Sequence, residues 1–353
     1  MELTVHTATP YQIVIQRGCL SQIGPRAVQL FGTGKSTVVV GDTNTIPLYG
    51  KTVVDSLQTS GISASAYSFP AGEGSKRLAT VERMLSEFVD RGLTRTDFVV
   101  ALGGGVTGDM AGFAAASYLR GVPFIQIPTS LLAQIDSSVG GKTGVDLPQG
   151  KNLIGAFWQP SLVLIDPDTL STLPEHFFAD GMGEAIKYGC IRNQSLLERL
   201  ERENAKDFLE EMIRECVDCK RVIVEHDEKE KGERMLLNFG HTLGHALEKV
   251  YGYQKLSHGE AVGIGMVLMT QASERARITK PGTAQRIANV LARYQLPVSD
   301  PAPMADLVKA ACSDKKSAGS SIRLVLLSSI GESLIHTVPH AQLLEFLTGG
   351  SHS

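Results

Sequence analysis

The first half of the chain alternates short apolar runs with amphipathic segments. The apolar runs have the length and composition of buried strands, whereas apolar residues in the other segments recur with the helical period. Strands are predicted at 11–18, 36–42, 97–105, 123–130 and 162–170, and helices at 76–92 and 110–121. Because helices that separate strands cover the faces of a parallel sheet, we expect an α/β domain with a Rossmann-like parallel sheet.

After Pro174 the pattern becomes mainly helical. Long stretches with the helical period predict helices at 193–226, 240–252, 259–277 and 283–294. One apolar segment, 322–338, is interrupted by Ile330-Gly331, and this pattern predicts a β-hairpin. We therefore expect two domains: an α/β domain over 1–178 and a mainly helical, all-α type domain over 179–353.

Composition limits the classes of partner. The chain has 353 residues, 42% of them hydrophobic, and a formal net charge of -3. This charge argues against a nucleic-acid partner, although it allows a local cationic pocket. The longest apolar runs fall short of the ~20 residues that span a bilayer, and the first residues do not resemble a signal peptide. We expect a cytoplasmic protein that binds a small molecule and neither nucleic acid nor a membrane.

The five cysteines are scattered, and an odd number argues against a disulfide framework. Only Cys216 and Cys219 form a CxxC pair, and they lie in a segment with a helical pattern. A second pair would be needed for a typical zinc site. We interpret both residues as reduced thiols rather than metal ligands.

Gly103, Gly105 and Gly108 form a G-x-G-x-x-G motif between a predicted strand and a helix expected to begin at Asp109. Such a turn lets backbone N–H groups approach a pyrophosphate. The acidic residue usually found about twenty positions later is missing. Asp42, at the end of another predicted strand, is a candidate for the ribose instead. A purely structural glycine turn remains an alternative.

A second glycine-rich segment, 134–152, carries Lys142, Lys151 and Asn152. It is not a Walker A loop, because Asp136 stands where that motif requires glycine. We expect a loop whose lysines are either solvated or gathered around an oxyanion together with backbone donors.

Three polar side chains share one face of the predicted helix 240–252: His241, His245 and Glu248. The HxxxH spacing by itself favours both histidines as ligands of one Zn²⁺. His258 begins the next predicted helix, and a helix N-terminus is expected to keep the imidazole neutral and able to bind a metal. A hydrogen-bonded core histidine is the alternative for His258.

Glu184 and Lys187 are three residues apart, so they lie on one helical face. Their neighbours are Gly, Met, Ala and Ile, which favours burial over an exposed ion pair. A buried carboxylate needs a cation, and a metal ion would serve.

Together these segments resemble the 3-dehydroquinate synthase family, the NAD- and zinc-dependent cyclases of the shikimate pathway. The resemblance lies in six ordered segments: 103–121, 128–152, 181–189, 233–248, 256–262 and 314–316. It implies a Rossmann-like NAD domain, a helical metal-binding domain, an active site between them and a homodimer.

The resemblance also implies roles for residues. The metal, Zn²⁺ with Co²⁺ as a substitute, is bound by Glu184, His241 and His258, so that His245 faces the substrate. The implied NAD contacts are Asp42, Asn44, Glu73, Lys76, Gly104, Gly105, Val106, Asp109, Thr129, Ser130, Lys142, Lys151, Thr169, Leu170 and Thr172. The implied catalytic and substrate-binding residues are Arg120 from the partner subunit, Asp136, Lys142, Lys151, Asn152, Lys187, Lys220, Arg234, Asn238, His245 and one of Lys315 and Lys316.

The implied substrate is a sugar acid phosphate, 3-deoxy-D-arabino-heptulosonate 7-phosphate. Oxidation by NAD, phosphate elimination, re-reduction, ring opening and an aldol closure give 3-dehydroquinate. In this scheme His245 either relays a proton or only binds the substrate. The alternatives are another sugar phosphate cyclase, a metal-dependent polyol dehydrogenase of the glycerol dehydrogenase kind, and a dinucleotide-binding regulator without activity.

Overall fold

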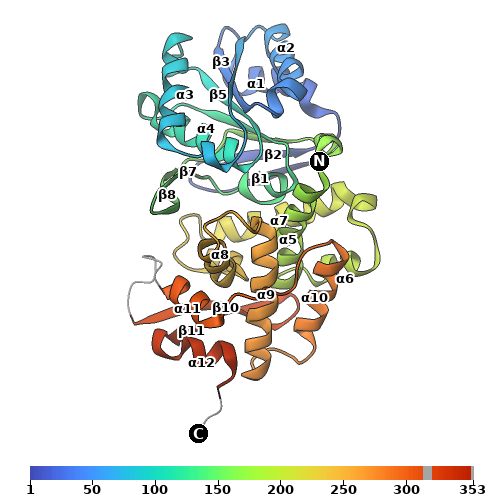
Figure 1. The fold of residues 1–353 in the computed structure, drawn as a ribbon. Coiled ribbons are helices and arrows are strands. Elements are labelled where there is room, and N and C mark those ends of the chain that lie inside the picture. The colour runs from blue at the N-terminus through green and yellow to red at the C-terminus, as the bar shows by residue number, and fades with distance from the viewer. Residues whose placement is uncertain (313–319, 351–353) are drawn as a thin grey trace. The chain divides into compact units, whose positions relative to one another are not determined.

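The computed structural model describes residues 1–312 and 320–350. The chain divides into two compact units, Met1–Pro174 and Glu175–Ser353, which we call unit 1 and unit 2. The boundary expected near residue 178 lies within α5 (Glu175–Ile191), so the division by contacts comes slightly earlier. Each unit is described by itself, and Figure 1 shows the elements of both.

Unit 1 contains a seven-stranded sheet in the order β1-β2-β9-β6-β5-β3-β4. All its pairs are parallel except β1 with β2. The strands are β1 (Glu2–Val5), β2 (Tyr11–Ile15), β3 (Ser36–Asp42), β4 (Ser63–Phe69), β5 (Phe98–Gly103), β6 (Phe124–Pro128) and β9 (Leu162–Ile165). The predicted parallel sheet is therefore confirmed, and β1 and β4 are added to it.

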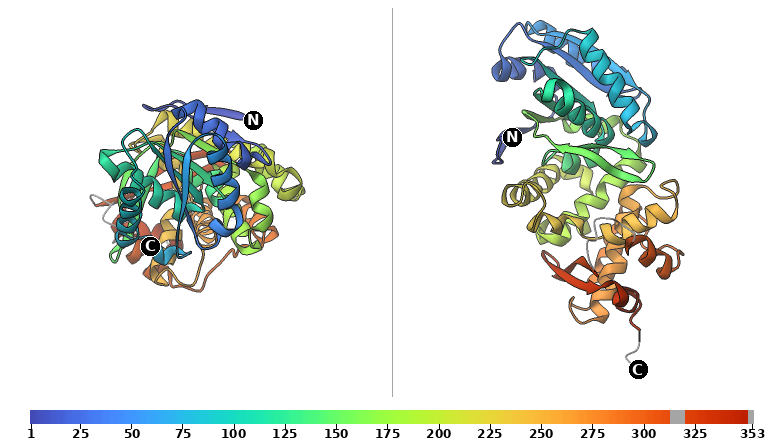
Figure 2. Two further views of the ribbon diagram at one scale, coloured as in Figure 1. Left: turned by 90° about the horizontal axis from the view of Figure 1, so that it is seen from above. Right: turned by 90° about the vertical axis from the view of Figure 1, so that its left-hand side faces the viewer.

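Helices cover both faces of this sheet (Figure 2). Along β3, Val38 and Val40 enter the core under α3 and α4, whereas Val39 enters the core under α1 and α2. Strands with two buried faces read as continuous apolar runs. The helices are α1 (Ile23–Phe31), α2 (Lys51–Thr59), α3 (Leu78–Asp90) and α4 (Gly105–Ser117).

The glycine-rich segment expected as a loop instead forms an antiparallel hairpin of β7 (Lys142–Leu147) and β8 (Gly150–Phe157). Gly144 pairs with Gly155, and a Cβ on either residue would lie within 2.5 Å of the opposite backbone. The glycines thus permit close pairing rather than flexibility. Lys142, Lys151 and Asn152 consequently lie on strands.

Unit 2 is mainly helical, as predicted. After α5 come α6 (Gln194–Arg202), α7 (Leu209–His226), α8 (His241–Val250), α9 (His258–Arg275), α10 (Thr283–Arg293), α11 (Met304–Cys312) and α12 (Leu343–Thr348). The pattern over 193–226 is divided between α6 and α7 by the short helix η7 (Ala205–Phe208), which the Asn204 side chain caps. The predicted hairpin is confirmed as β10 (Ser321–Ser329) and β11 (Glu332–Pro339), and its apolar side chains pack on α8, α9 and α12.

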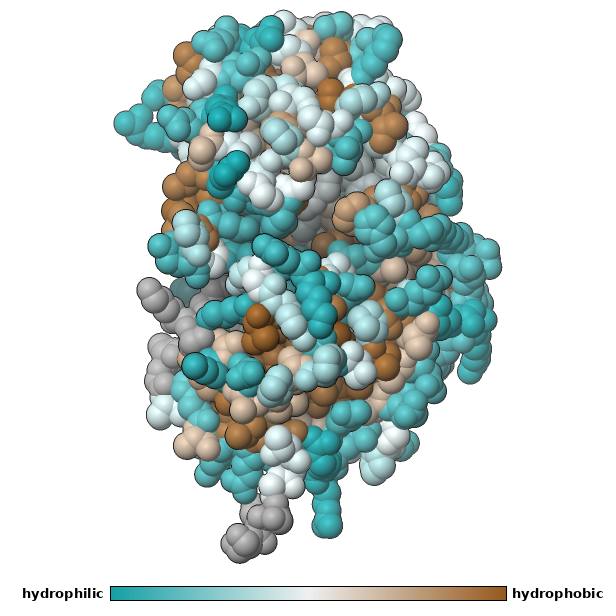
Figure 3. All heavy atoms as spheres, viewed as in Figure 1, coloured by the Kyte–Doolittle hydropathy of each residue, from teal (hydrophilic) through white to brown (hydrophobic). Residues whose placement is uncertain are grey.

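Hydrophobic and hydrophilic side chains are interspersed over the face of each unit seen in Figure 3. Within the described residues, no helix combines the length and hydropathy needed to cross a bilayer. None of the five cysteines forms a disulfide within the described residues, and Cys216 and Cys219 are buried in α7.

Candidate active site and metal centre

Three neighbouring strands of unit 1 end at the same edge of the sheet. β3 pairs with β5 and β5 pairs with β6, and both pairs are parallel. The ends of these strands therefore bring together Asp42, the glycine turn and Thr129. The Thr129 N–H donates to the Gly103 carbonyl at 3.0 Å. Ligands of doubly wound α/β proteins bind at the carboxyl edge of the sheet. The sheet order therefore explains how Asp42, from another strand, comes to stand beside the glycine turn.

The helix after the glycine turn begins at Gly105 and not, as predicted, at Asp109. Its N-cap, Gly104, provides no side chain to satisfy the first N–H groups. A Cβ on Gly105 would lie 3.1 Å from the Ser137 hydroxyl oxygen, tighter than most such contacts. Glycine thus keeps open the approach to a helix N-terminus, which favours an anion such as a pyrophosphate.

Asp42 organises the turn that follows β3. Its Oδ1 accepts hydrogen bonds from the backbone N–H groups of Asn44 and Thr45 at 2.9 and 2.8 Å. The Asn44 side chain is exposed beside it. The carboxylate is thereby held at the edge of the sheet.

A buried lysine links residues implied for cofactor and substrate. Lys76 is 6% exposed, and its Nζ lies 2.6 Å from Asp109 Oδ2 and 2.6 Å from Asn152 Oδ1. Asp146, which sequence reasoning missed, accepts from the Asn152 N–H at 2.7 Å. Burial lowers the Lys76 pKa, but the charges of Asp109 and Glu73 outweigh it and raise this pKa above its usual value. Lys76 thus remains charged and holds the β7–β8 hairpin against α4.

Thr169, Leu170 and Thr172 lie in one short helix, η6 (Pro167–Thr172). Gln134 Nε2 donates to the Thr169 hydroxyl at 3.0 Å, and the Tyr49 hydroxyl donates to the Thr169 carbonyl at 2.9 Å. These bonds fix the helix beside the segment that carries Asp136.

The remaining implied residues of unit 1 differ in exposure. Glu73 and Lys142 are exposed, whereas Val106 and Ser130 are partly buried. Arg120 is exposed and has a positive φ of 71°, as does Leu119 before it, with 48°. This backbone projects Arg120 from the end of η4 (Tyr118–Arg120).

The three implied metal ligands meet inside unit 2. Glu184 Oε1 lies 3.4 Å from His241 Nε2 and 3.6 Å from His258 Nε2. One ligand atom from each residue falls within 4.8 Å of the others. A carboxylate and two imidazoles on separate helices are a donor set that suits Zn²⁺ or Co²⁺ and leaves coordination positions for a substrate. The residues present therefore fit a divalent metal.

A second group overlaps the first: His245, Glu248 and His258 also bring ligand atoms within 4.8 Å. His245 is exposed, and its ring centroid lies 5.3 Å from that of His241. The HxxxH pair thus divides between the two groups, because His241 belongs only to the first and His245 only to the second.

The histidine pKa values respond to these neighbours in opposite directions. Burial lowers the His241 pKa to about 3, against the opposing charge of Glu184. Burial also lowers the His258 pKa, but hydrogen bonds to Glu184 and Glu248 outweigh it and raise this pKa to about 10. In the protein without a metal, these two carboxylates therefore oppose the effect of the helix N-terminus, which was predicted to keep His258 neutral.

Glycines at helix crossings bring the ligands together. A Cβ on Gly259 would lie 2.0 Å from the Asp180 carbonyl oxygen, and one on Gly183 would lie 2.8 Å from that of Gly259. The neighbours of these two glycines, Glu184 on α5 and His258 on α9, consequently face each other across the crossing. Asp180, also missed from sequence, accepts from the Gly259 N–H at 2.5 Å.

Three cationic residues implied for the substrate are deeply buried: Lys187, Lys220 and Arg234 are 1%, 6% and 1% exposed. They come from α5, α7 and η8 (Glu233–Asn238), which pack against one another. Lys187 forms an ion pair with Glu184, so the exposed-pair alternative is excluded. Asn238 ends η8, and its Nδ2 donates to Glu230 Oε1 at 3.4 Å. Lys315 and Lys316 lie outside the described residues.

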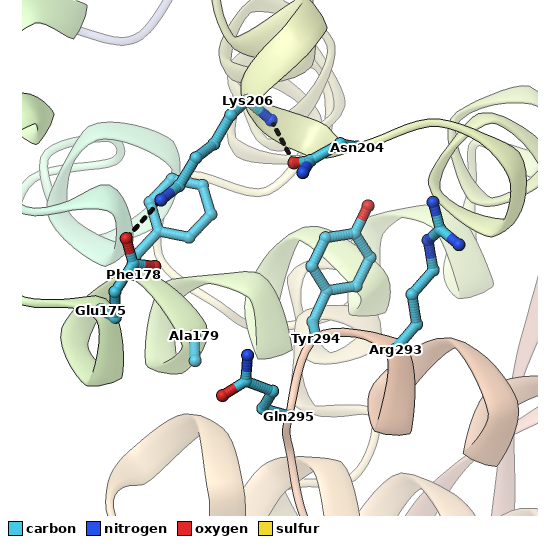
Figure 4. A pocket seen from close by; sticks show the side chains of 8 residues that line it. All are labelled: Glu175, Phe178, Ala179, Asn204, Lys206, Arg293, Tyr294 and Gln295. Carbon is cyan, nitrogen blue, oxygen red and sulfur yellow. Dashed lines mark hydrogen bonds and ion pairs between the residues drawn. The ribbon is translucent and has the colours of Figure 1, made fainter.

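A separate cavity of about 310 Å³ in unit 2 contains none of these residues. Glu175, at the start of α5, pairs with Lys206 across it, and Tyr294 lines the side formed by the end of α10 (Figure 4). Since the cavity lacks the metal ligands, it is not the predicted site.

Comparison with solved structures defines the class of protein to which the fold belongs. The structure of 2-deoxy-scyllo-inosose synthase with carbaglucose-6-phosphate, NAD⁺ and Co²⁺ matches with a TM-score of 0.88 at 23% identity, over 99% of this chain and 100% of that chain. The 2-epi-5-epi-valiolone synthase of Streptomyces hygroscopicus, solved with NAD⁺ and Zn²⁺, matches with a TM-score of 0.85 at 26% identity, over 96% of each chain. The protein has the sugar phosphate cyclase fold.

Sequence comparisons place it more narrowly. Profiles described as 3-dehydroquinate synthase N-terminal and C-terminal match residues 66–180 and 181–317. The 3-dehydroquinate synthase of Clostridium kluyveri is 46% identical over 342 residues, which cover 96% of this chain and 95% of that protein. The chain belongs to the 3-dehydroquinate synthase family.

Proposed function

We propose that the protein converts 3-deoxy-D-arabino-heptulosonate 7-phosphate into 3-dehydroquinate and phosphate. The observation that carries the proposal is the convergence of Glu184, His241 and His258 in a chain of this family. A regulator without activity would have no use for such a centre. Identities of 23% and 26% to the two cyclases with other products, against 46% to a 3-dehydroquinate synthase, support the substrate.

Unit 2 supplies the metal ligands and the cations of the site. When bound, the metal lowers the pKa of substrate hydroxyls and NAD supplies transient oxidation and its reversal. Lys187, Lys220 and Arg234 place positive charge in a poorly hydrated interior, where attraction to a phosphate or carboxylate is stronger than in water. This explains how a protein of net charge -3 binds a substrate with both anionic groups.

His245 faces the substrate in this proposal rather than the metal. We propose that the exposed imidazole either binds a hydroxyl of the substrate or moves a proton at it. Arg234 and Asn238, both on η8, are proposed to orient the carboxylate end of the substrate.

Unit 1 supplies the cofactor contacts. The backbone N–H groups at the start of α4 are proposed to bind the pyrophosphate of NAD, and Asp42 its ribose. Lys76 fixes Asn152 and Asp109, so that contacts to cofactor and substrate depend on one charge cluster.

The protein is further proposed to act in the cytoplasm as a homodimer in which Arg120 reaches the partner's site. Inactive Arg120→Ala and His241→Ala proteins, when mixed, are then expected to regain activity through hybrid dimers. The absence of any recovery would contradict a shared site.

The substrate is tested by phosphate release from three sugar phosphates under identical conditions with NAD⁺ and Zn²⁺. We expect release from the heptulosonate phosphate and none from sedoheptulose 7-phosphate or glucose 6-phosphate. Preferential release from either of the latter two would identify another cyclase activity.

A further inference from the structure

We propose that Glu248 is a positioning residue of the metal centre: its carboxylate accepts the Nδ1–H of His258 and so directs Nε2 of that ring toward the metal. The inference rests on the proposed ligand set of Glu184, His241 and His258. It assigns a function to a buried carboxylate that is not among the implied ligands.

The two sides of the His258 ring meet different carboxylates. Nε2 lies 3.6 Å from Glu184 Oε1, and Nδ1 lies 3.5 Å from Glu248 Oε1. An imidazole can bind a metal through one nitrogen while the other donates a hydrogen bond, and that bond selects the tautomer. Glu248 thus occupies the position from which the tautomer of His258 is set.

The other histidine of the centre has the same arrangement. His241 Nδ1 lies 3.1 Å from the Phe239 carbonyl oxygen, which can only accept, so this nitrogen carries the proton. Its Nε2 faces Glu184 Oε1 at 3.4 Å. Each ring therefore turns Nε2 toward Glu184 and Nδ1 toward an acceptor. Glu248 accepts from His258 in the same way that the Phe239 carbonyl accepts from His241.

The burial of Glu248 supports its proposed contact with the His258 ring. Glu248 is 2% exposed and lies on α8, one turn after His245, whereas His258 begins α9. An ionised carboxylate is costly to bury without a charge or donor beside it. The His258 ring provides one, and α8 packs closely on α9 because Gly244 faces Ala261 there.

The overlapping group of His245, Glu248 and His258 offers a competing interpretation, in which Glu248 is itself a ligand. In that group the ion would take the Nδ1 side of His258 and exclude Glu184. The convergence of two Nε2 atoms on one carboxylate favours the first group.

The test compares the affinity of purified variants for Co²⁺, measured by competition with a chelator and followed by the visible absorption of the bound ion. Glu248→Gln retains the shape of the side chain but removes its charge, and Glu248→Ala removes the acceptor. Mutation of a residue that hydrogen-bonds to a metal ligand typically weakens metal affinity 10- to 100-fold. We expect a loss of about 10-fold for Gln and nearer 100-fold for Ala, with a similar absorption spectrum.

Glu260→Gln is the matched control. Glu260 lies two residues after His258, and its carboxylate accepts from the Ser257 N–H at 2.8 Å in a capping box. Glutamine also serves at this position of the motif. The variant removes one negative charge near His258 without removing a contact to its ring, and we expect unchanged Co²⁺ affinity. The melting temperature of the metal-free variants checks folding.

The outcomes separate the inference from the ligand set. If Glu184→Ala and His258→Ala abolish Co²⁺ binding while Glu248→Gln and Glu248→Ala bind as wild type, only the positioning role is refuted. If Glu184→Ala retains Co²⁺ and His245→Ala loses it, the ion is bound by the group of His245, Glu248 and His258. Both the proposed ligand set and the positioning role of Glu248 are then refuted. Equal losses in Glu248→Gln and Glu260→Gln would show a general charge effect and refute the specific contact.

Discussion

The glycine at the α5–α9 crossing offers a sharp perturbation of the metal centre. Gly259 follows the proposed ligand His258, and its substitution by alanine adds one Cβ atom at the crossing. That atom would lie 2.0 Å from the Asp180 carbonyl oxygen and 2.8 Å from its carbon, although real Cβ atoms essentially never come within 3.0 Å of such neighbours. The obstacle is backbone, which cannot rotate away.

The size of the effect follows from these distances. To restore the contact from 2.0 Å to at least 3.0 Å, α5 and α9 must separate locally by on the order of 1 Å. Metal sites tolerate deviations of only about 0.2 Å in ligand distance. Because Glu184 and His258 lie on opposite sides of this crossing, we expect Gly259→Ala to weaken Co²⁺ binding more than 10-fold and to cost about 1–3 kcal/mol of stability through overpacking.

Gly263→Ala, four residues along α9, is the control. Its Cβ would meet a terminal carbon of the flexible Leu291 side chain at 3.1 Å, and helix propensity gains about 1 kcal/mol. Chelator competition and thermal unfolding are measured on both variants. Co²⁺ affinity in Gly259→Ala equal to that of Gly263→Ala would refute the argument that close helix packing sets the ligand geometry.

Three further predictions concern single side chains. His245→Ala is expected to retain stoichiometric zinc while losing turnover; loss of zinc in elemental analysis would make His245 a ligand. Lys187→Ala is expected to raise the KM for the heptulosonate phosphate strongly, because it removes a charge that is only 1% exposed, and unchanged kinetics would limit Lys187 to its ion pair. Burial raises the pKa of Asp97, but hydrogen bonds from Ser36 and Thr94 outweigh burial and hold this pKa below its usual value. The ionised Asp97 side chain therefore stabilises the fold at pH values above its unfolded pKa of about 4. This stabilisation is lost as the pH falls through the lower pKa of the folded state. The difference in melting temperature between wild type and Asp97→Asn should shrink over that fall, and a difference that is constant with pH would contradict the assignment.

The sequence was most informative where one local signal determines structure. The apolar run 36–42 corresponds to β3 residue for residue, and the helix predicted to start at His258 does begin there. The β7–β8 hairpin was missed because Gly144, Gly150 and Gly155 carry no side chain to display the alternation of a strand.

The metal centre shows a different limit. The spacing of His241 and His245 favoured a pair of ligands on one ion, because residues four apart share a helical face. The roles proposed for these histidines depend on Glu184 and His258, which lie on other helices, and no local sequence pattern indicates that distance. Asp180 was missed for the same reason, since the Gly259 N–H that it accepts from is remote in sequence. Asp146 was missed together with the hairpin, across which it accepts from the Asn152 N–H.

The central claim, that NAD is used and regenerated within one reaction, is tested most directly by supplying NAD⁺ far below the concentration of the heptulosonate phosphate. Phosphate release and NADH absorbance are followed together on the zinc-loaded protein. The account predicts that phosphate release continues until the substrate is consumed, with no net NADH at the end. Accumulation of NADH, or phosphate release that stops once it equals the NAD⁺ supplied, would contradict it.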